Sequence, residues 1–141
     1  MSDRNTSHLA GEFLVAGELS RRGYSVSITM GNAKSIDIFV ETGKGIVLID
    51  AKATKTKGNW PITEENAQRG TAKGLYYIFV YLQTDKRIAK ENVPPEYFIV
   101  KSSEILKKGL IKTWKTRQGI TYKDLNNNSF KNRWDKLPDC P

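Results

Sequence analysis

The sequence predicts an α/β protein in which helices cover both faces of a central mixed β-sheet. Two observations support this: apolar strand-like runs alternate with segments of helical period, and their order is helix, three strands, helix, two strands, helix. With 141 residues, 38% of them hydrophobic and 10% aromatic, the chain has the composition of one globular domain. We therefore expect a single domain over residues 1–141, with a core at about 6–101 and a C-terminal wrap at about 102–141.

A first helix is expected over residues 8–22, capped by Thr6 or Ser7 and ended by Gly23. Its apolar stripe is expected to contain Leu9, Phe13, Ala16 and Leu19 or Ser20. Glu12 lies beside that stripe, so we expect its side chain to point partly toward the core. The sequence also permits a simpler interpretation, in which Glu12 is an ordinary residue at the boundary of the stripe.

Three strands are expected after this helix. Residues 24–30 alternate apolar and polar side chains, which indicates a strand at or near a sheet edge. Residues 35–41 and 46–52 are apolar on both faces, which indicates a central β-hairpin. Gly43 and Lys44 suit a two-residue type II′ turn between its strands.

The register of this hairpin decides how two acidic residues lie. Ile38 faces Ile49, so Asp37 lands opposite Asp50 and two carboxylates share one face of an apolar sheet. Directly opposed like charges destabilise a sheet, and a hard divalent cation is the simplest way to offset their repulsion. Lys52, two residues past Asp50, adds an ammonium group on the same face. The alternative is a plain buried ion pair between Lys52 and one of the two acids.

The rest of the chain is expected to supply a second helix, two strands and a short third helix. The expected segments are a basic loop at 53–62, a helix at 63–73, a strand at 75–82, a polar connection at 86–95, a strand at 96–100 and a helix at 104–108. The aromatic side chains of the C-terminal wrap are spaced by polar residues and are expected to pack on the core rather than form a docking patch. They include Trp114, Tyr122, Phe130 and Trp134.

Net charge and amino-acid composition favour some classes of function and exclude others. The net charge of +8 and a pI near 9.6 favour a polyanionic partner. Cys140 is the single cysteine, which excludes a disulfide framework and a thiolate zinc site. The only histidine, His8, is expected to have a surface or capping role, so a His-dependent mechanism is not favoured. No apolar run has the length of a membrane span and the N-terminus lacks a signal peptide's apolar stretch, so we expect a cytoplasmic protein.

Three features in the first 55 or so residues resemble the PD-(D/E)XK nuclease superfamily. They are Glu12 on the first helix, Asp37 within Ser-Ile-Asp-Ile, and Asp50-Ala51-Lys52 after the hairpin. The pattern is most similar to the Holliday-junction-resolvase-like branch. Ile36 replaces the superfamily's nominal proline, and Asp50 stands where that branch usually has Glu. The resemblance implies a restriction-endonuclease-like α/β/α sandwich.

The resemblance also implies a Mg²⁺ site, with Mn²⁺ as a possible substitute. Asp37 and Asp50 would bind the cation, with the Ala51 carbonyl as a further ligand and Glu12 holding a metal-bound water or a second ion. Lys52 would orient the attacking water in the first place, or help to deprotonate it, so the implied catalytic residues are Glu12, Asp37, Asp50 and Lys52. The implied products carry 5′-phosphate and 3′-hydroxyl ends.

The implied partner is DNA, bound by a homodimer that places one active site on each of two strands. Basic residues near the acids are expected to meet phosphates. Trp60 has two equally favoured roles, stacking on an unpaired base or anchoring its loop in a pocket. The candidate DNA-binding residues are Lys34, Lys55, Lys57, Trp60, Gln68, Arg69 and Lys73.

Three functions remain open at this point. The first is a Mg²⁺-dependent DNA endonuclease acting on branched DNA in repair or recombination. The second is a restriction-like or defence nuclease of the same superfamily, with a partner that selects the sequence. The third is a non-catalytic DNA-binding or assembly protein that retains the nuclease fold.

Overall fold

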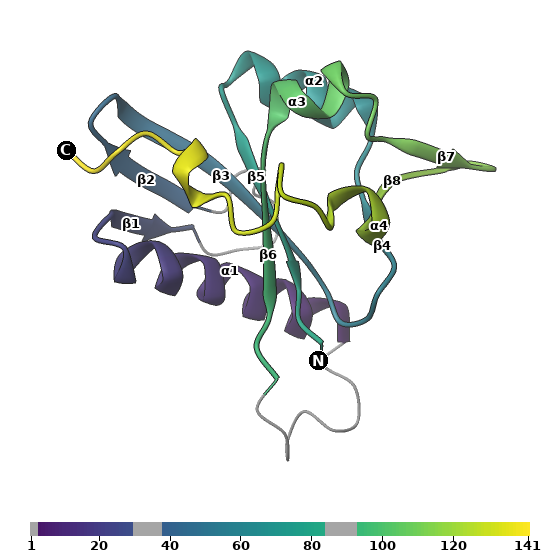
Figure 1. Ribbon diagram of the computed structural model, residues 1–141, viewed down its shortest axis with the longest axis horizontal. Coiled ribbons are helices and arrows are strands. Elements are labelled where there is room, and N and C mark those ends of the chain that lie inside the picture. Colours follow the sequence, from purple (N-terminus) through teal and green to yellow (C-terminus); the bar gives the residue numbers. More distant parts are fainter. Residues whose placement is uncertain (1–2, 30–37, 84–92) are drawn as a thin grey trace.

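The structure, a computed structural model, describes residues 3–29, 38–83 and 93–141. A five-stranded mixed sheet of order β1-β2-β3-β5-β6 forms its centre, with helices on both faces (Figure 1). This confirms the α/β class. The first three strands form an antiparallel meander, β5 runs parallel to β3, and β6 runs antiparallel to β5. The strands are β1 (Ser25–Ile28), β2 (Ile38–Thr42), β3 (Gly45–Thr54), β5 (Tyr76–Tyr81) and β6 (Glu96–Lys101).

Helix α1 (Asp3–Arg21) covers one face of the sheet and begins earlier than the sequence predicts. Its buried stripe is also rotated from the expected one, because Phe13 is 54% exposed while Glu12 lies within the buried stripe. The buried residues are Ser7, Gly11, Glu12, Val15, Ala16 and Leu19. The helix packs closely on β3, since a Cβ placed on Gly11 would lie 2.7 Å from the Cβ of Ala53.

The hairpin of β2 and β3 has the predicted register. Thr42 pairs with Gly45 and Ile38 pairs with Ile49, and β3 is the middle strand of the five. The predicted type II′ turn is wrong, however, because that turn needs a positive φ at Gly43, whereas the glycine with positive φ is Gly45, at +103°. Asp37, the next residue of the predicted ladder, lies outside the described residues, as does Lys34.

Helices α2 (Glu64–Ala72) and α3 (Ser102–Lys107) pack together on the opposite face. Helix α2 begins where the sequence predicts, with the Thr63 hydroxyl accepting a hydrogen bond from the Asn66 amide. Gly70 lies inside this helix because there is no room for a side chain: a Cβ there would be 2.6 Å from the Ser102 hydroxyl. Close contact between the two helices therefore explains a glycine that helix propensity disfavours.

A second, three-stranded sheet was not predicted. It has the order β4-β8-β7 and lies on the same side of the central sheet as α2 and α3. Its strands are β4 (Asn59–Pro61), β7 (Lys112–Trp114) and β8 (Arg117–Thr121), followed by the short helix α4 (Tyr122–Leu125). The expectation of a loop throughout residues 53–62 is thus wrong, because β3 continues to Thr54 and residues 59–61 pair with β8.

The C-terminal segment crosses from one face of the central sheet to the other. It follows the outer edge of β6, where the Ile99 amide donates to the Phe130 carbonyl and the Asn132 amide to the Tyr97 carbonyl. It then continues through the 3₁₀ helix η1 (Trp134–Lys136) to the β2–β3 turn (Figure 1). Trp134 packs in the same buried cluster as the apolar residues of α1.

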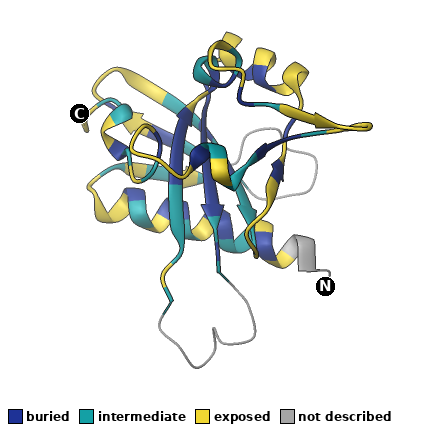
Figure 2. Cartoon of the chain, turned by 45° about the vertical axis from the view of Figure 1, so that its right-hand side comes forward, coloured by how far each residue is buried: buried dark blue, intermediate teal, exposed yellow. Residues whose placement is uncertain are grey.

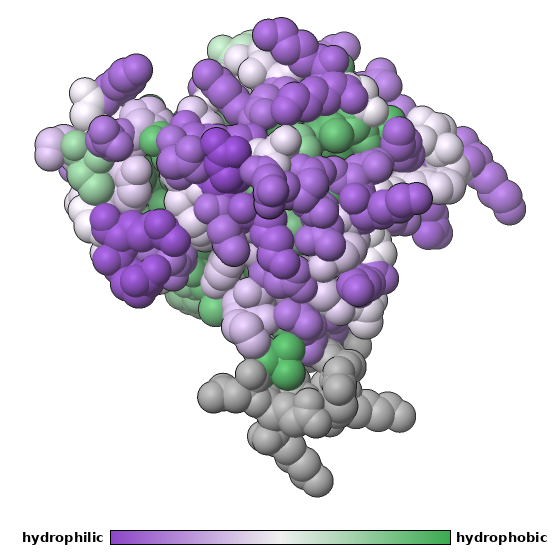
Figure 3. Space-filling view, viewed as in Figure 1, coloured by the Kyte–Doolittle hydropathy of each residue, from purple (hydrophilic) through white to green (hydrophobic). Residues whose placement is uncertain are grey.

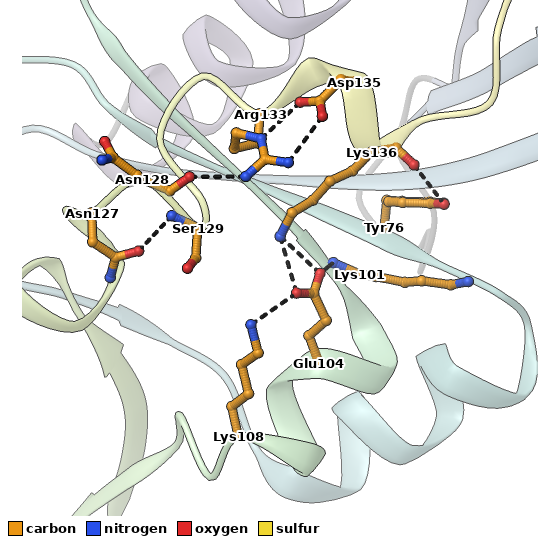
Figure 4. Close-up of polar contacts among 10 residues, drawn as sticks. All are labelled: Tyr76, Lys101, Glu104, Lys108, Asn127, Asn128, Ser129, Arg133, Asp135 and Lys136. Atoms are coloured by element: carbon orange, nitrogen blue, oxygen red, sulfur yellow. Dashed lines mark hydrogen bonds and ion pairs between the residues drawn. The ribbon is translucent and has the colours of Figure 1, made fainter.

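One carboxylate ties this segment to α3 (Figure 4). Glu104 accepts hydrogen bonds from the ammonium of Lys136 at 2.9 and 3.0 Å, the ammonium of Lys108 at 3.3 Å and the amide of Lys101 at 3.0 Å. Burial alone would raise the pKa of Glu104, but these donors together hold it below its ordinary value. The carboxylate is therefore ionised in the neutral pH range.

Among the helices that the structure describes, none combines the length and apolar character needed to cross a membrane.

Candidate active site

Asp50 and Lys52 lie together on the central strand, as the sequence predicts. They are two residues apart on β3 and project from the same face, with Asp50 in register with Tyr77 and Lys52 with Phe79 of β5. Lys52 Nζ is 3.7 Å from Asp50 Oδ2, and the two side chains are 27% and 17% exposed. The pair is partly desolvated but retains access to solvent.

Tyr77 forms an aromatic wall beside this pair and was not singled out from the sequence. Lys52 Nζ lies 5.9 Å from the centroid of the Tyr77 ring. The Tyr77 hydroxyl donates to the Asn66 carbonyl at 3.3 Å. Burial, and after it the charge of Asp50, raises the pKa of Tyr77 far above its usual range. The Tyr77 phenol is therefore neutral. Its ring borders the site with a surface of low polarity, which screens charge only weakly.

Glu12 points into the protein, as expected from its place on α1. Its side chain is 1% exposed, and its Oε1 lies 2.6 Å from Nε2 of His8, one turn earlier on the helix. His8 itself is 46% exposed. The sequence predicts a surface or capping role for His8, and this contact was not predicted, although the spacing of four residues between the two side chains was a signal for it.

Helix α1 reaches β3 from the face opposite to Asp50 and Lys52. The helix packs against Ala51 and Ala53, whose side chains alternate with those of the acid and the lysine. Glu12 thus lies in the layer behind this stretch of β3. A metal site shared by Glu12 and Asp50, with the Ala51 carbonyl as a further ligand, stays a prediction.

The chemistry of the available donors suits a hard cation. Asp50 offers carboxylate oxygens, which Mg²⁺ and Mn²⁺ prefer, on the face of Lys52, whereas the buried Glu12 carries its carboxylate in the layer behind β3. No three histidine, cysteine, aspartate or glutamate side chains gather as a metal-binding group within residues 3–29, 38–83 and 93–141. Asp37, one of the three predicted acids, lies outside those ranges.

The predicted DNA-binding residues fall into three groups. Lys57, after β3, is exposed, with its Nζ 5.1 Å from the Tyr122 ring, and Lys55 is half-buried. On α2, Gln68, Arg69 and its C-cap Lys73 are exposed, and Arg69 pairs with Glu65. The third group is Lys34, which lies outside the described residues, and Trp60, which lies on β4.

Trp60 takes the second of the two roles that the sequence leaves open, anchoring rather than base stacking. Its indole is fully buried on β4, with ring centroids 5.4 Å from Phe79 and 5.8 Å from Phe98. Its Nε1 donates to the Val80 carbonyl at 3.2 Å. Of the two roles considered from the sequence, the structure shows the anchoring one: Trp60 fixes the small sheet to β5.

No model of a known protein family and no curated protein matches this chain.

Proposed function

We propose that this protein is a Mg²⁺-dependent DNA endonuclease with a restriction-endonuclease-like fold of the PD-(D/E)XK superfamily. It hydrolyses phosphodiester bonds to 5′-phosphate and 3′-hydroxyl ends, with branched DNA as the substrate of a resolvase-like enzyme. One observation carries the proposal: Asp50 and Lys52 form a partly buried pair, 3.7 Å apart, on one face of the central strand of a mixed sheet.

A contribution to folding stability is a poor explanation for the pair of Asp50 and Lys52. Exposed ion pairs contribute about 0–1 kcal/mol, and buried pairs are often no better than apolar residues of similar size. The neighbouring strand positions on β5 are occupied by Tyr77 and Phe79, so apolar side chains would pack well at this place. An acid and a lysine at these two positions therefore indicate a catalytic role rather than a packing role.

The proposed site would hold Mg²⁺ through Asp50, with Asp37 as a further carboxylate and Glu12, from α1, holding a metal-bound water or a second ion. When bound, the cation supplies positive charge that polarises the phosphodiester and lowers the pKa of water. Lys52 positions the attacking water and stabilises the negative charge that develops on the phosphate oxygens. The water oxygen bonds to phosphorus while the bond from phosphorus to O3′ breaks, and O3′ leaves with a proton as the 3′-hydroxyl.

Charge supports DNA as the polyanion. The chain carries 23 Lys and Arg residues against 15 Asp and Glu, and hydrophilic side chains cover most of the face seen in Figure 3. Lys55 and Lys57 follow β3 directly, within a few residues of Lys52. Contacts of lysine and arginine with phosphates make binding salt-dependent. In the proposed homodimer, a two-fold axis would present one such site to each of two strands.

A cleavage panel tests the proposal. Four-way junction, flap, linear duplex and single-stranded DNA are incubated with the protein in Mg²⁺, Mn²⁺ or EDTA. We expect cleavage only with metal, and a loss of at least about 100-fold in Asp50→Ala and Lys52→Ala. Asp135→Ala is the matched control, since Asp135 is an exposed acid paired with Arg133. The proposal is wrong if no substrate is cut, or if both variants cut as well as the wild type.

A further inference from the structure

The hairpin of β7 and β8 projects from the body of the protein (Figure 1). All three residues of β7 are exposed, as is Arg117 at the start of β8, and β7 and the tip of the hairpin carry the exposed colour in Figure 2. Residues 112–117 read Lys-Thr-Trp-Lys-Thr-Arg and contain three basic residues and no acid. Core packing does not explain a large aromatic side chain in so polar a hairpin, which is called the arm below.

Trp114 is the aromatic residue of this arm and is 39% exposed. Its ring lies across Gly119 of β8, since a Cβ added to Gly119 would be 3.4 Å from Cζ3 of the indole. The same Cβ would be 2.8 Å from the Trp60 carbonyl, so a side chain at this position would collide with β4. The backbone of the small sheet therefore supports the indole while much of the ring stays accessible.

The charges around Trp114 are available for a partner. Lys112 Nζ lies 3.9 Å from Asp124, but neither Lys115 nor Arg117 forms an ion pair with any part of the chain that the structure describes. Arg117 is the cross-strand partner of Trp114, and Lys115 is held at the tip with φ +54°. Together with Trp114 and Thr116 they line a hollow that is partly open to solvent.

We propose that this hairpin binds an unpaired segment of DNA, with a base stacked on Trp114 and flanking phosphates on Lys115 and Arg117. Stacking on an exposed aromatic ring combined with nearby cations is how proteins hold single strands without reading their sequence. The small sheet and the pair of Asp50 and Lys52 lie on the same side of the central sheet. The inference rests on the proposed function for its choice of DNA, and it assigns recognition of unpaired DNA to this arm.

Binding without cleavage tests the inference. A fluorescently labelled single strand and the blunt duplex of the same sequence are titrated by anisotropy in EDTA. We expect Trp114→Ala to weaken binding of the single strand about tenfold, the size of one lost base–aromatic stack, and to change duplex binding little. Trp114→Phe should keep most of the affinity. Ile46→Ala is the matched control, since Ile46 is 62% exposed beside the turn of the other hairpin.

Charge and assembly are measured on the same samples. The double variant Lys115→Ala, Arg117→Ala should lower the slope of log affinity against log salt by about 1.4, or about 0.7 for each lost phosphate contact. An unchanged single-strand affinity in Trp114→Ala, or an equal loss for duplex and single strand, overturns the inference. So does a wild-type dimer that Trp114→Ala dissociates without a change in DNA binding, because the arm would then contact a second copy.

The EDTA assay separates this inference from the proposed function. A protein that binds single strands through Trp114 but never cuts DNA contradicts the nuclease proposal and leaves the role of the hairpin intact. A protein that cuts DNA in metal but binds single strands equally well without Trp114 gives the opposite result. Thermal melting of each variant checks the fold, which an exposed residue on a projecting hairpin should affect little.

Discussion

At the scale of single residues, two neighbouring side chains define the position of the Lys52 ammonium. This ammonium lies 3.7 Å from the Asp50 carboxylate and 5.9 Å from the centroid of the Tyr77 ring, and 27% of the Lys52 side chain is exposed. The carboxylate attracts the ammonium, and the ring lies within the distance of a cation–π contact. An ammonium held there suits a substrate phosphate that carries growing negative charge.

Removing this ammonium should slow catalysis far more than it affects folding. In Lys52→Ala we expect the single-turnover cleavage rate to fall about 10²–10⁴-fold, the range typical of a lost catalytic group. The free energy of unfolding should change by less than about 1 kcal/mol, since the pair is only partly buried. Lys101→Ala is the control, because Lys101 Nζ also lies 5.9 Å from a tyrosine ring, that of Tyr76. Equal rates in both variants would exclude a special role for Lys52.

Among the elements, the β2–β3 hairpin could be predicted from sequence and the rotation of α1 could not. Two apolar runs around a short turn fix the hairpin register, so Ile38 pairs with Ile49 as expected. The rotation of α1 depends on what it packs against. Gly11 is small enough to let the helix approach Ala53, and this contact turns Glu12 inward and Phe13 outward. No local pattern in residues 3–21 contains that information.

Two glycines of α1 provide a test of this close approach. In Gly11→Ala the new Cβ would meet Ala53 Cβ at 2.7 Å, and we expect a loss of about 1–3 kcal/mol in the free energy of unfolding. In Gly17→Ala nothing lies within 4 Å, so better helix propensity should add about 0.5–1 kcal/mol. Urea denaturation of both variants measures the difference. Equal stabilisation by the two substitutions would contradict the close packing of α1 on β3.

At the scale of the whole molecule, the pairing of strands that lie far apart in the sequence is the part of the fold that could not be predicted. Strands β4 and β8 pair across some 60 residues, with Trp60 opposite Ile120, and each strand is too short to be recognised from its own sequence. The burial of Trp60 follows from this pairing, so the sequence of the basic loop left base stacking and anchoring as equal alternatives for Trp60. For the candidate site, the pairing of Asp50 with Lys52 followed from strand alternation alone.

The C-terminal segment depends on Glu104 for its attachment to α3 (Figure 4). We expect Glu104→Gln to lower the free energy of unfolding by about 1.5–3 kcal/mol, because the Lys136 ammonium, 16% exposed, loses a charged partner. In Lys108→Met the loss should stay below about 0.5 kcal/mol, since that lysine is 48% exposed. Chemical denaturation at neutral pH measures both. Similar losses in the two variants would show that burial of Lys136 does not matter.

The same carboxylate predicts a pH dependence. Its pKa is lower in the folded protein than the ordinary value of 4.5, so the unfolded chain binds the proton more readily. The stability contributed by Glu104 is therefore present above about pH 4.5 and is lost as the pH falls through the folded pKa. Melting temperatures measured from pH 7 to pH 3 should fall less steeply in Glu104→Gln than in the wild type. Parallel curves would contradict this linkage.

The central claim is that Asp50 holds a divalent cation beside Lys52, and calorimetric titration with Mn²⁺ tests it most directly. We expect the wild type to bind the ion, Asp50→Asn to lose at least about tenfold in affinity through loss of a charged ligand, and Asp135→Asn to bind like the wild type. Asp50→Asn preserves the shape of the side chain, so a change in its affinity reports the missing charge. Mn²⁺ binding by Asp50→Asn with wild-type affinity, or no binding by the wild type, would contradict the account.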